Sequence, residues 1–552
     1  MQNFMNQISS SSSRFAMTAA MLITMQLSSL QAQQPDSQDA SIPATDRQKL
    51  ILISPETTRI TQPLTADGYV DYVAAMDALK ARGATPATNF EVVVRQVMGH
   101  GELPEAIRPE YYDRLGIPVP AEDSFSYQTF QTFSNVASMS ADQQFEFDQM
   151  YNAVSDSKWT AADYPQAAAW LKAVNPALDR LVDGAARPHY YTPYVTMPPA
   201  DDEPSSSPPL MSLLLPAVQT QREIARALRI RAMSHLGEGN LDAAWKDLRA
   251  IRRIARHNDR NSILIEGLVA IAIDAITFTA DQMLLNADLS AEQIQDYLRE
   301  LNQLPDMQPM AAKIDQSERF MGLDATQSMA RNIAAAGEIP GLDDGLLSKV
   351  LSMLLAGSNQ NDGVSGVDWN VTLRLLNRHY DELVESMQLA DPQERDAAFA
   401  RQQQQLSELQ AQMQNPLKMM FSLIGNNRRQ KAGEAIGNVL VSLLLPAVQQ
   451  VRTAEDLSRS RRDTVRIAFA LRHHKQVTGS FPETLSELVP DYIVSLPVDP
   501  ATGQPYTYRQ QNNGFLIYGC GRNGSDDNGL TEDIRPENDR ESDDIAVHYH
   551  GR

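Results

Sequence analysis

A nearly unbroken apolar run from Ser262 to Leu285 constrains the fold more than any other stretch of this sequence. A run of this length is either a membrane-spanning helix or the buried centre of a helical domain. Glu266 and Asp274 interrupt it, and a carboxylate inside a bilayer is costly. We therefore expect the run to form the central buried helix of a mainly α-helical protein.

Apolar residues recur at helical spacing on both sides of this run, which predicts packed helices over most of the chain. The segments with this pattern are 69–79, 88–98, 107–115, 141–154, 164–183, 210–236, 241–255, 289–304, 310–331, 368–389, 393–413 and 434–477. The pair 210–236 and 241–255, joined by a glycine-containing turn, resembles one tetratricopeptide-type helix hairpin. A single unit does not support an extended repeat array.

The length of 552 residues predicts two to four domains. Polar, proline-rich stretches suggest where the chain divides. The expected parts are a signal peptide (1–32), a disordered linker (33–59), a helical domain (60–195), a Pro/Ser/Asp-rich linker (196–209), a second helical domain (210–430) and a C-terminal module (431–552).

The protein is acidic, with 48 Lys and Arg against 69 Asp and Glu and a formal net charge of −21. Such a surface repels phosphate backbones and anionic membranes, so nucleic acid is not an expected partner. The single cysteine, Cys520, forms no intramolecular disulfide, and we interpret it as a small buried hydrophobe.

The N-terminal residues are typical of an export signal. Arg14 is followed by an apolar stretch from Phe15 to Leu27 and by the small-residue site Leu30-Gln31-Ala32. A methionine-rich leader without a targeting role is the alternative. The signal predicts a periplasmic or extracellular protein with no stable membrane insertion after cleavage.

In the last quarter of the chain the pattern changes from helices to short strands. The segments 505–509 and 514–519 read as a hairpin and 545–549 as a third strand. Between them lie a glycine- and acid-rich run, 521–529, and a second acidic cluster ending at Asp544. Calcium prefers six to eight oxygen ligands, which acids, amides and carbonyls between glycines can supply. A solvated charge run is the alternative interpretation.

The same quarter carries motifs in a specific order. They are Gly479-Ser480-Phe481-Pro482, Leu488-Val489-Pro490, Leu496-Pro497-Val498-Asp499-Pro500, Gly503-Gln504-Pro505-Tyr506 and Asp544-Ile545. This order resembles the globular part of type II secretion major pseudopilins. The resemblance covers 431–552 and implies a long helix on a three-stranded antiparallel sheet, with calcium bound by the loop after the hairpin. Carried over by position, the implied ligands are Asn523, Asp526, Asp527, Asp543 and Asp544.

Elsewhere, 60–89 and 222–256 resemble segments of uncharacterised exported bacterial families. We therefore expect an exported, non-enzymatic scaffold or interaction protein, linked to a secretion or pilus-like system, with cell-envelope proteins as partners. The alternative is an exported hydrolase whose carboxylate site is assembled from scattered residues such as Asp71, Glu266 and His257. The oligomeric state stays open.

A basic helical face stands out in this acidic chain. It is formed by Arg249, Arg252, Arg253 and Arg256. We expect these arginines to pair with internal carboxylates rather than to bind substrate.

Overall fold

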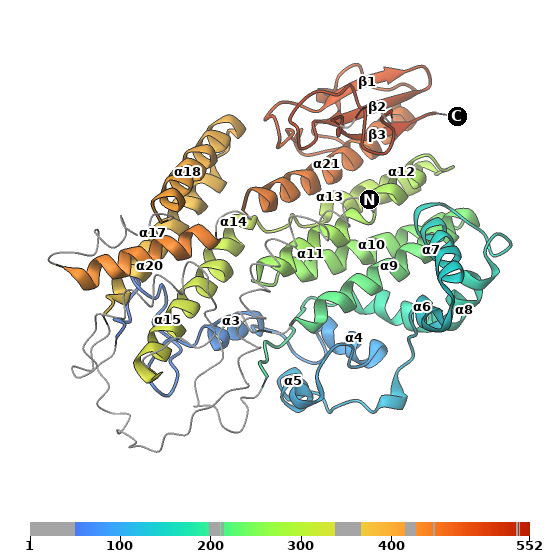
Figure 1. Ribbon diagram of the computed structural model, residues 1–552. Coiled ribbons are helices and arrows are strands. Elements are labelled where there is room, and N and C mark those ends of the chain that lie inside the picture. Colours follow the sequence, from blue (N-terminus) through green and yellow to red (C-terminus); the bar gives the residue numbers. More distant parts are fainter. Residues whose placement is uncertain are drawn as a thin grey trace.

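The computed structural model describes most of the chain. The described residues are 50–197, 210, 213, 215–336, 366–413, 427–444, 448–536, 539 and 541–551. The predicted signal peptide (1–32) lies outside them, as does almost all of the predicted linker 196–209. The described part is mainly α-helical with one small three-stranded antiparallel sheet near the C-terminus, which confirms the predicted fold class (Figure 1).

Most helices follow the predicted segments, but 310–331 is divided between α14 and α15, and 434–477 between α20 and α21. Their bounds are α3 Tyr72–Lys80, α4 Phe90–Met98, α5 Arg108–Leu115, α6 Phe130–Phe133, α7 Ala141–Asp156, α8 Pro165–Gly184, α9 Pro216–Gly237, α10 Leu241–Asp259, α11 Leu264–Ala275, α12 Phe278–Leu285, α13 Ala291–Gln303, α14 Met310–Lys313, α15 Arg319–Ala336, α17 Trp369–Gln388, α18 Pro392–Met413, α20 Arg428–Leu444 and α21 Val448–Thr478. Local chemistry sets several of these limits. At α7, for example, Ser140 and Gln143 form a capping box that satisfies two free N–H groups.

Helices α9 and α10 form the hairpin at the centre of the molecule (Figure 1). Pro216 begins α9, where its missing N–H costs nothing. Gly237 is the last residue of α9 and lies against the backbone of Trp159. A Cβ there would lie 2.0 Å from the Trp159 carbonyl oxygen, so this close contact requires glycine. Arg231 of α9 donates two hydrogen bonds to the carboxylate of buried Asp247 on α10 (2.9 and 2.6 Å), which link the two helices.

The apolar run that constrains the sequence forms α11 and α12, with a break at Ile276 and Thr277. By length and composition alone, the stretch Leu264–Leu285 could cross a membrane, yet 61% of its apolar window is buried inside the protein. The two acids named from the sequence are buried and paired, Glu266 with Lys80 (3.2 Å) and Asp274 with Arg256. A third acid of the run, Asp281, is buried against Arg252. The run is therefore the buried helical centre that the sequence predicts.

The sheet has the order β1 (Thr507–Gln511), β2 (Gly514–Gly519) and β3 (Ile545–Tyr549), and all its pairings are antiparallel. The central strand β2 is buried along its whole length. Its two faces have different partners, because successive side chains of a strand point to opposite sides. Phe515 and Ile517 belong to the main core with α21, whereas Leu516 and Tyr518 form a small outer cluster with Ala546.

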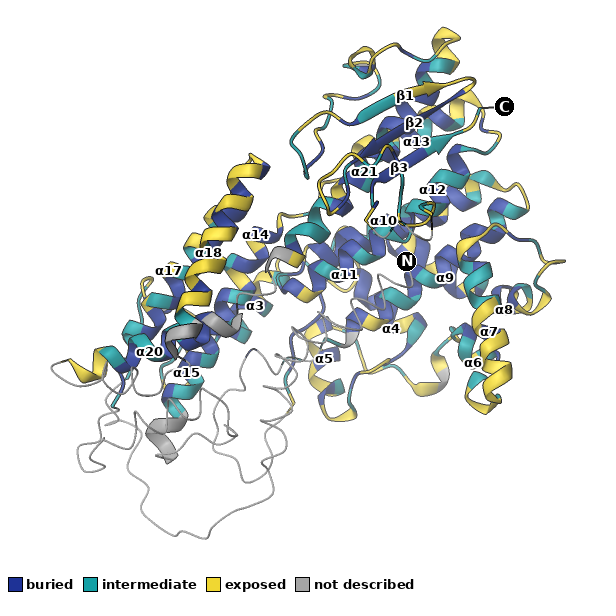
Figure 2. Ribbon diagram, turned by 45° about the horizontal axis from the view of Figure 1, so that its top comes forward, coloured by how far each residue is buried: buried dark blue, intermediate teal, exposed yellow. Residues whose placement is uncertain are grey.

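One continuous apolar core joins the three predicted domains, as the dark interior in Figure 2 illustrates. At its centre Trp245 of α10 stacks on Tyr297 of α13 (ring centroids 4.3 Å apart) and contacts Phe469 of α21 (6.1 Å). Trp170 of α8 and Phe515 of β2 belong to the same core. Residues of the ranges 60–195, 210–430 and 431–552 therefore share this core.

A second core lies where α15, α17 and α20 meet, on the side of the molecule away from the sheet (Figure 1). It includes Ile51, from the range expected to be a disordered linker. In the described part of that range, Thr57 and Thr58 are buried, and the Asn377 side chain donates to the Thr57 carbonyl (3.0 Å). Ordered structure thus extends to residues before 60, because α17 supplies hydrogen-bond partners for this polar segment.

Candidate functional site

The two acidic arms of the C-terminal loop, far apart in sequence, meet in space. The Asp543 N–H donates to Asp527 Oδ2 (2.9 Å), and the Asp527 N–H donates to Asp544 Oδ2 (3.1 Å). Asp544 Oδ2 also accepts from the Gly529 N–H (2.8 Å). The loop between β2 and β3 is therefore closed by reciprocal contacts between its first and second arms.

Glycine makes this close approach possible. A Cβ at Gly521 would lie 2.0 Å from the Asp543 carbonyl oxygen and 2.2 Å from its carboxylate Oδ1. At Gly529, with φ +84°, a Cβ would lie 2.8 Å from Leu516 on the outer face of the sheet. Tyr518 on the same face donates its hydroxyl to Asp526 Oδ1 (2.9 Å). The acidic loop consequently folds back over the outer face of the sheet.

Asp544 is the most enclosed of the candidate ligands. Its side chain is fully buried, and its Oδ1 has no hydrogen-bond partner within the described residues. Burial raises the pKa of the Asp544 carboxyl to about 6, and the negative charges of Asp527 and Asp526 add to this. A buried carboxylate oxygen beside two further carboxylates is the arrangement that a bound cation would stabilise.

The fit of the five implied ligands to calcium is uneven. Asp526 and Asp527 lie near enough to Asp544 to perturb its pKa, and Asp544 has a buried oxygen without a partner among the described residues. Across the described ranges, no group of three or more His, Cys, Asp or Glu side chains has the spacing of a metal site. A cation here would therefore also need backbone carbonyl or water oxygens, which calcium accepts.

The other two implied ligands, Asn523 and Asp543, form hydrogen bonds within the loop. Asn523 donates its amide to Asp527 Oδ2 and to the Glu541 carbonyl (2.9 Å each), and its Oδ1 accepts from the Ser525 N–H (2.7 Å). Asp543 accepts from the backbone N–H of Arg522 (3.0 Å). Their side chains position the arms rather than leaving oxygens free.

Cys520 lies at the base of this loop. Its N–H donates to Asp499 Oδ2 (2.8 Å). Burial raises the pKa of the Cys520 thiol to about 12, and the neighbouring carboxylates Asp499 and Asp544 reinforce the shift. The thiol is therefore protonated at neutral pH and is a poor nucleophile.

The residues named for a hydrolase are each held by other groups. Glu266 accepts from Lys80, from the Tyr194 hydroxyl (2.5 Å) and from Asn261 (2.8 Å). His257 faces the Ala185 carbonyl (3.0 Å), and Asp71 caps α3 by accepting from the Ala74 N–H. None of the three lines the cavity described below.

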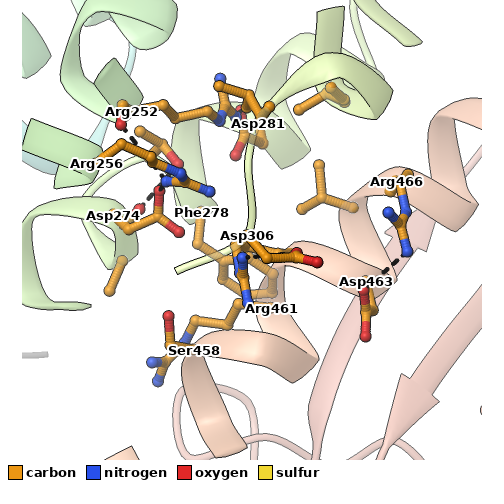
Figure 3. A pocket seen from close by; sticks show the side chains of 16 residues that line it. Arg252, Arg256, Asp274, Phe278, Asp281, Asp306, Ser458, Arg461, Asp463 and Arg466 are labelled. Atoms are coloured by element: carbon orange, nitrogen blue, oxygen red, sulfur yellow. Dashed lines mark hydrogen bonds and ion pairs between the residues drawn. The ribbon is translucent and has the colours of Figure 1, made fainter. Parts of the chain in front are cut away.

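Three of the four arginines of the basic face pair with acids, as expected, whereas Arg253 forms no ion pair with the described residues. Arg249 contacts Glu300 (2.5 Å), Arg252 contacts Asp281 and Arg256 contacts Asp274. Beside these pairs the structure contains a polar cavity between α10–α12 and α21, which no sequence motif indicates (Figure 3). Only the four arginines around Asp463 between Arg459 and Arg466 on α21 could have drawn attention to it.

No family model, curated protein or solved structure matches this chain.

Proposed function

We propose that this protein is an exported, non-enzymatic scaffold or interaction protein whose C-terminal pseudopilin-like module is stabilised by calcium. The observation that carries the proposal is Asp544, a fully buried carboxylate with one oxygen unpartnered among the described residues and with Asp526 and Asp527 beside it. Without a cation these charges repel one another, so binding would favour the closed loop.

The arrangement of the module supports its likeness to pseudopilins. A 31-residue helix, α21, carries a three-stranded antiparallel sheet, and the acidic loop follows the hairpin. Asp526, Asp527 and Asp544 would hold the ion, and its charge would offset theirs. Asn523 and Asp543 would keep the two arms in register through their contacts with the loop backbone.

The contacts that α21 makes within the chain support a scaffold role. Its sides pack on α11, α12, α13 and α14 of the same chain as well as on the sheet. Since these contacts cover the helix, it is not free to assemble side by side with copies of itself. Interaction with envelope partners would instead use other surfaces of the protein.

The test is thermal unfolding of the full mature chain with calcium and with EGTA, because the C-terminal module shares its core with the rest of the molecule. If the dissociation constant is near 10 μM, 1 mM calcium stabilises the fold by about 2.7 kcal/mol. The melting temperature should rise with calcium and saturate. Magnesium at the same concentration should have a smaller effect, because it demands a stricter octahedral geometry.

The variant Asp544→Asn tests the residues. It should abolish the calcium-dependent shift, whereas Asp533→Asn, an exposed acid of the same loop, should keep it. A wild-type melting temperature that is equal in calcium and EGTA would refute the metal site. Equal loss of the shift in both variants would mean that calcium acts only through general charge screening.

A further inference from the structure

A cavity lies between two parts of the chain that are far apart in sequence. One wall comes from α10, α11 and α12 and the segment after α13, and the other from α21 (Figure 3). Its lining is dominated by charge, with five arginines and four aspartates: Arg252, Arg256, Arg461, Arg462 and Arg466 against Asp274, Asp281, Asp306 and Asp463. In a protein of net charge −21, such a concentration of arginine is unusual and points to a function beyond solubility.

Every aspartate of the lining has an arginine partner. Asp281 pairs with Arg252 and Asp274 with Arg256, and both pairs are buried. Asp306, which is 91% exposed at the rim, pairs with Arg462 (3.4 Å), and Asp463 pairs with Arg466 (3.1 Å). One positive charge is thereby left over.

The remaining charge belongs to Arg461. Its guanidinium makes no hydrogen bond or ion pair with the residues that the structure describes. Burial lowers the pKa of Arg461 and the charge of Arg522 adds to this, while Glu532 and Asp533 act in the opposite direction. The residue is half-buried, and its guanidinium nitrogens are not among the buried atoms that lack a partner, so water reaches this charge at the cavity.

The unsatisfied polar atoms of the lining are all possible donors. Within the described residues, the buried atoms without a partner are Ser458 Oγ, Arg252 Nη1, Arg462 Nε and Arg466 Nε, whereas no aspartate oxygen of the lining is in this state. Ser458 is 4% exposed and Arg252 also 4%. Buried donors without acceptors are costly, so the cavity calls for a group that accepts several hydrogen bonds.

The size of the cavity limits what that group can be. Its volume of about 50 Å³ has room for a few waters, since one water needs roughly 10–15 Å³ of the same measure. The same space suits one oxyanion group of about five heavy atoms but no nucleotide or oligosaccharide. Water has donors of its own and does not neutralise Arg461, whereas an oxyanion accepts from every side and supplies the missing negative charge.

We propose that this cavity binds one small oxyanion group, with phosphate as its model, held by Arg461 and Ser458 of α21 and by the free N–H groups of the paired arginines. The group would join α21 to α10–α12 across the cavity. None of the lining residues belongs to the acidic loop, but charges of that loop act on Arg461, so the test of this proposal is made without calcium.

The experiment is titration of the full mature chain with inorganic phosphate, followed by calorimetry and by thermal unfolding. EGTA is present throughout so that calcium takes no part, and sodium chloride holds the ionic strength constant. Phosphate should bind saturably and raise the melting temperature. No binding beyond the chloride control would overturn the proposal and leave the cavity to water.

Two variants and one control identify the site. Arg461→Gln should weaken phosphate binding at least tenfold, and because Arg461 makes no ion pair the variant should fold normally by circular dichroism. Ser458→Ala should weaken it about threefold. Lys475→Gln removes the same charge from α21 at a position that does not line the cavity, so it should change the affinity less than twofold. Equal weakening by Lys475→Gln and Arg461→Gln would overturn the assignment.

A parallel titration with glycerol 1-phosphate distinguishes the source of the group. Binding within threefold of inorganic phosphate would identify a phosphate monoester carried by a larger molecule that enters past exposed Asp306. Binding of inorganic phosphate alone would identify the free ion. Failure of both would overturn the proposal.

Discussion

Asp324 should make the stability of the protein fall as the pH rises. It lies on α15, is 7% exposed and accepts a hydrogen bond from the Leu210 N–H. It has no ion-pair partner among the described residues. Burial raises the pKa of its carboxyl from 3.8 to about 7, and the nearby charge of Asp71 adds to this, while Arg331 opposes it.

The size of the effect follows from linkage. Because the folded pKa is about 7, the folded chain retains a proton that the unfolded chain releases above about pH 4. Asp324 therefore does not destabilise the folded state below about pH 4, and the destabilisation grows as the pH rises to about 7. A shift of roughly three units corresponds to about 4 kcal/mol at pH 8, at 1.36 kcal/mol per unit. At pH 5 only about 1–2 kcal/mol of this cost remains.

The variant Asp324→Asn removes the charge and keeps an oxygen for the Leu210 N–H. It should unfold at a higher urea concentration than the wild type at pH 8, and the difference should shrink at pH 5. Circular dichroism at the two pH values measures both quantities. Asp396→Asn, an exposed acid on α18, is the control and should change little at either pH. A difference for Asp324→Asn that is the same at pH 5 and pH 8, or negative at pH 8, would refute the reasoning.

Two further predictions concern buried contacts. Lys80→Met leaves buried Glu266 without its cation and should cost about 3–5 kcal/mol in urea unfolding, and adding Glu266→Gln should recover part of this loss because the uncompensated charge disappears. Gly521→Ala forces a Cβ against Asp543 and should destabilise the chain by about 1–3 kcal/mol in the same assay. Gly524→Ala should cost less, since its φ of +65° is strained but nothing lies within 4 Å of the added Cβ; a larger loss at Gly524 would contradict this account.

The local parts of the fold were predictable from the sequence, because helices and hairpins depend on near neighbours. The segment 141–154 corresponds to α7, 164–183 to α8 and 545–549 to β3. The break between α11 and α12 was missed, since no proline or glycine marks it in the sequence. The shared core was not predictable, because contacts such as Trp245 with Phe469 join helices that are more than two hundred residues apart in the chain.

Within the candidate site, the sequence indicated which side chains meet but not which of them are already satisfied. The resemblance to pseudopilins implied that Asp527 lies near Asp543 and Asp544, and these residues are in contact. The Asn523 amide donates to the Glu541 carbonyl, and this depends on a side-chain orientation that sequence spacing does not reveal. The cavity was invisible for a similar reason, since the lack of a partner for Arg461 is a property of the packed structure.

The shared core around Trp245, Tyr297 and Phe469 also determines how the molecule would come apart. Loss of the C-terminal sheet and α21 would expose the apolar faces of α13 and α10. Unfolding at that end would therefore destabilise the rest of the core rather than release a folded fragment. A protease that cuts the loop between β2 and β3 would therefore be expected to trigger degradation of the whole chain. The last hundred residues therefore contribute to the stability of the main core and do not form an independent unit.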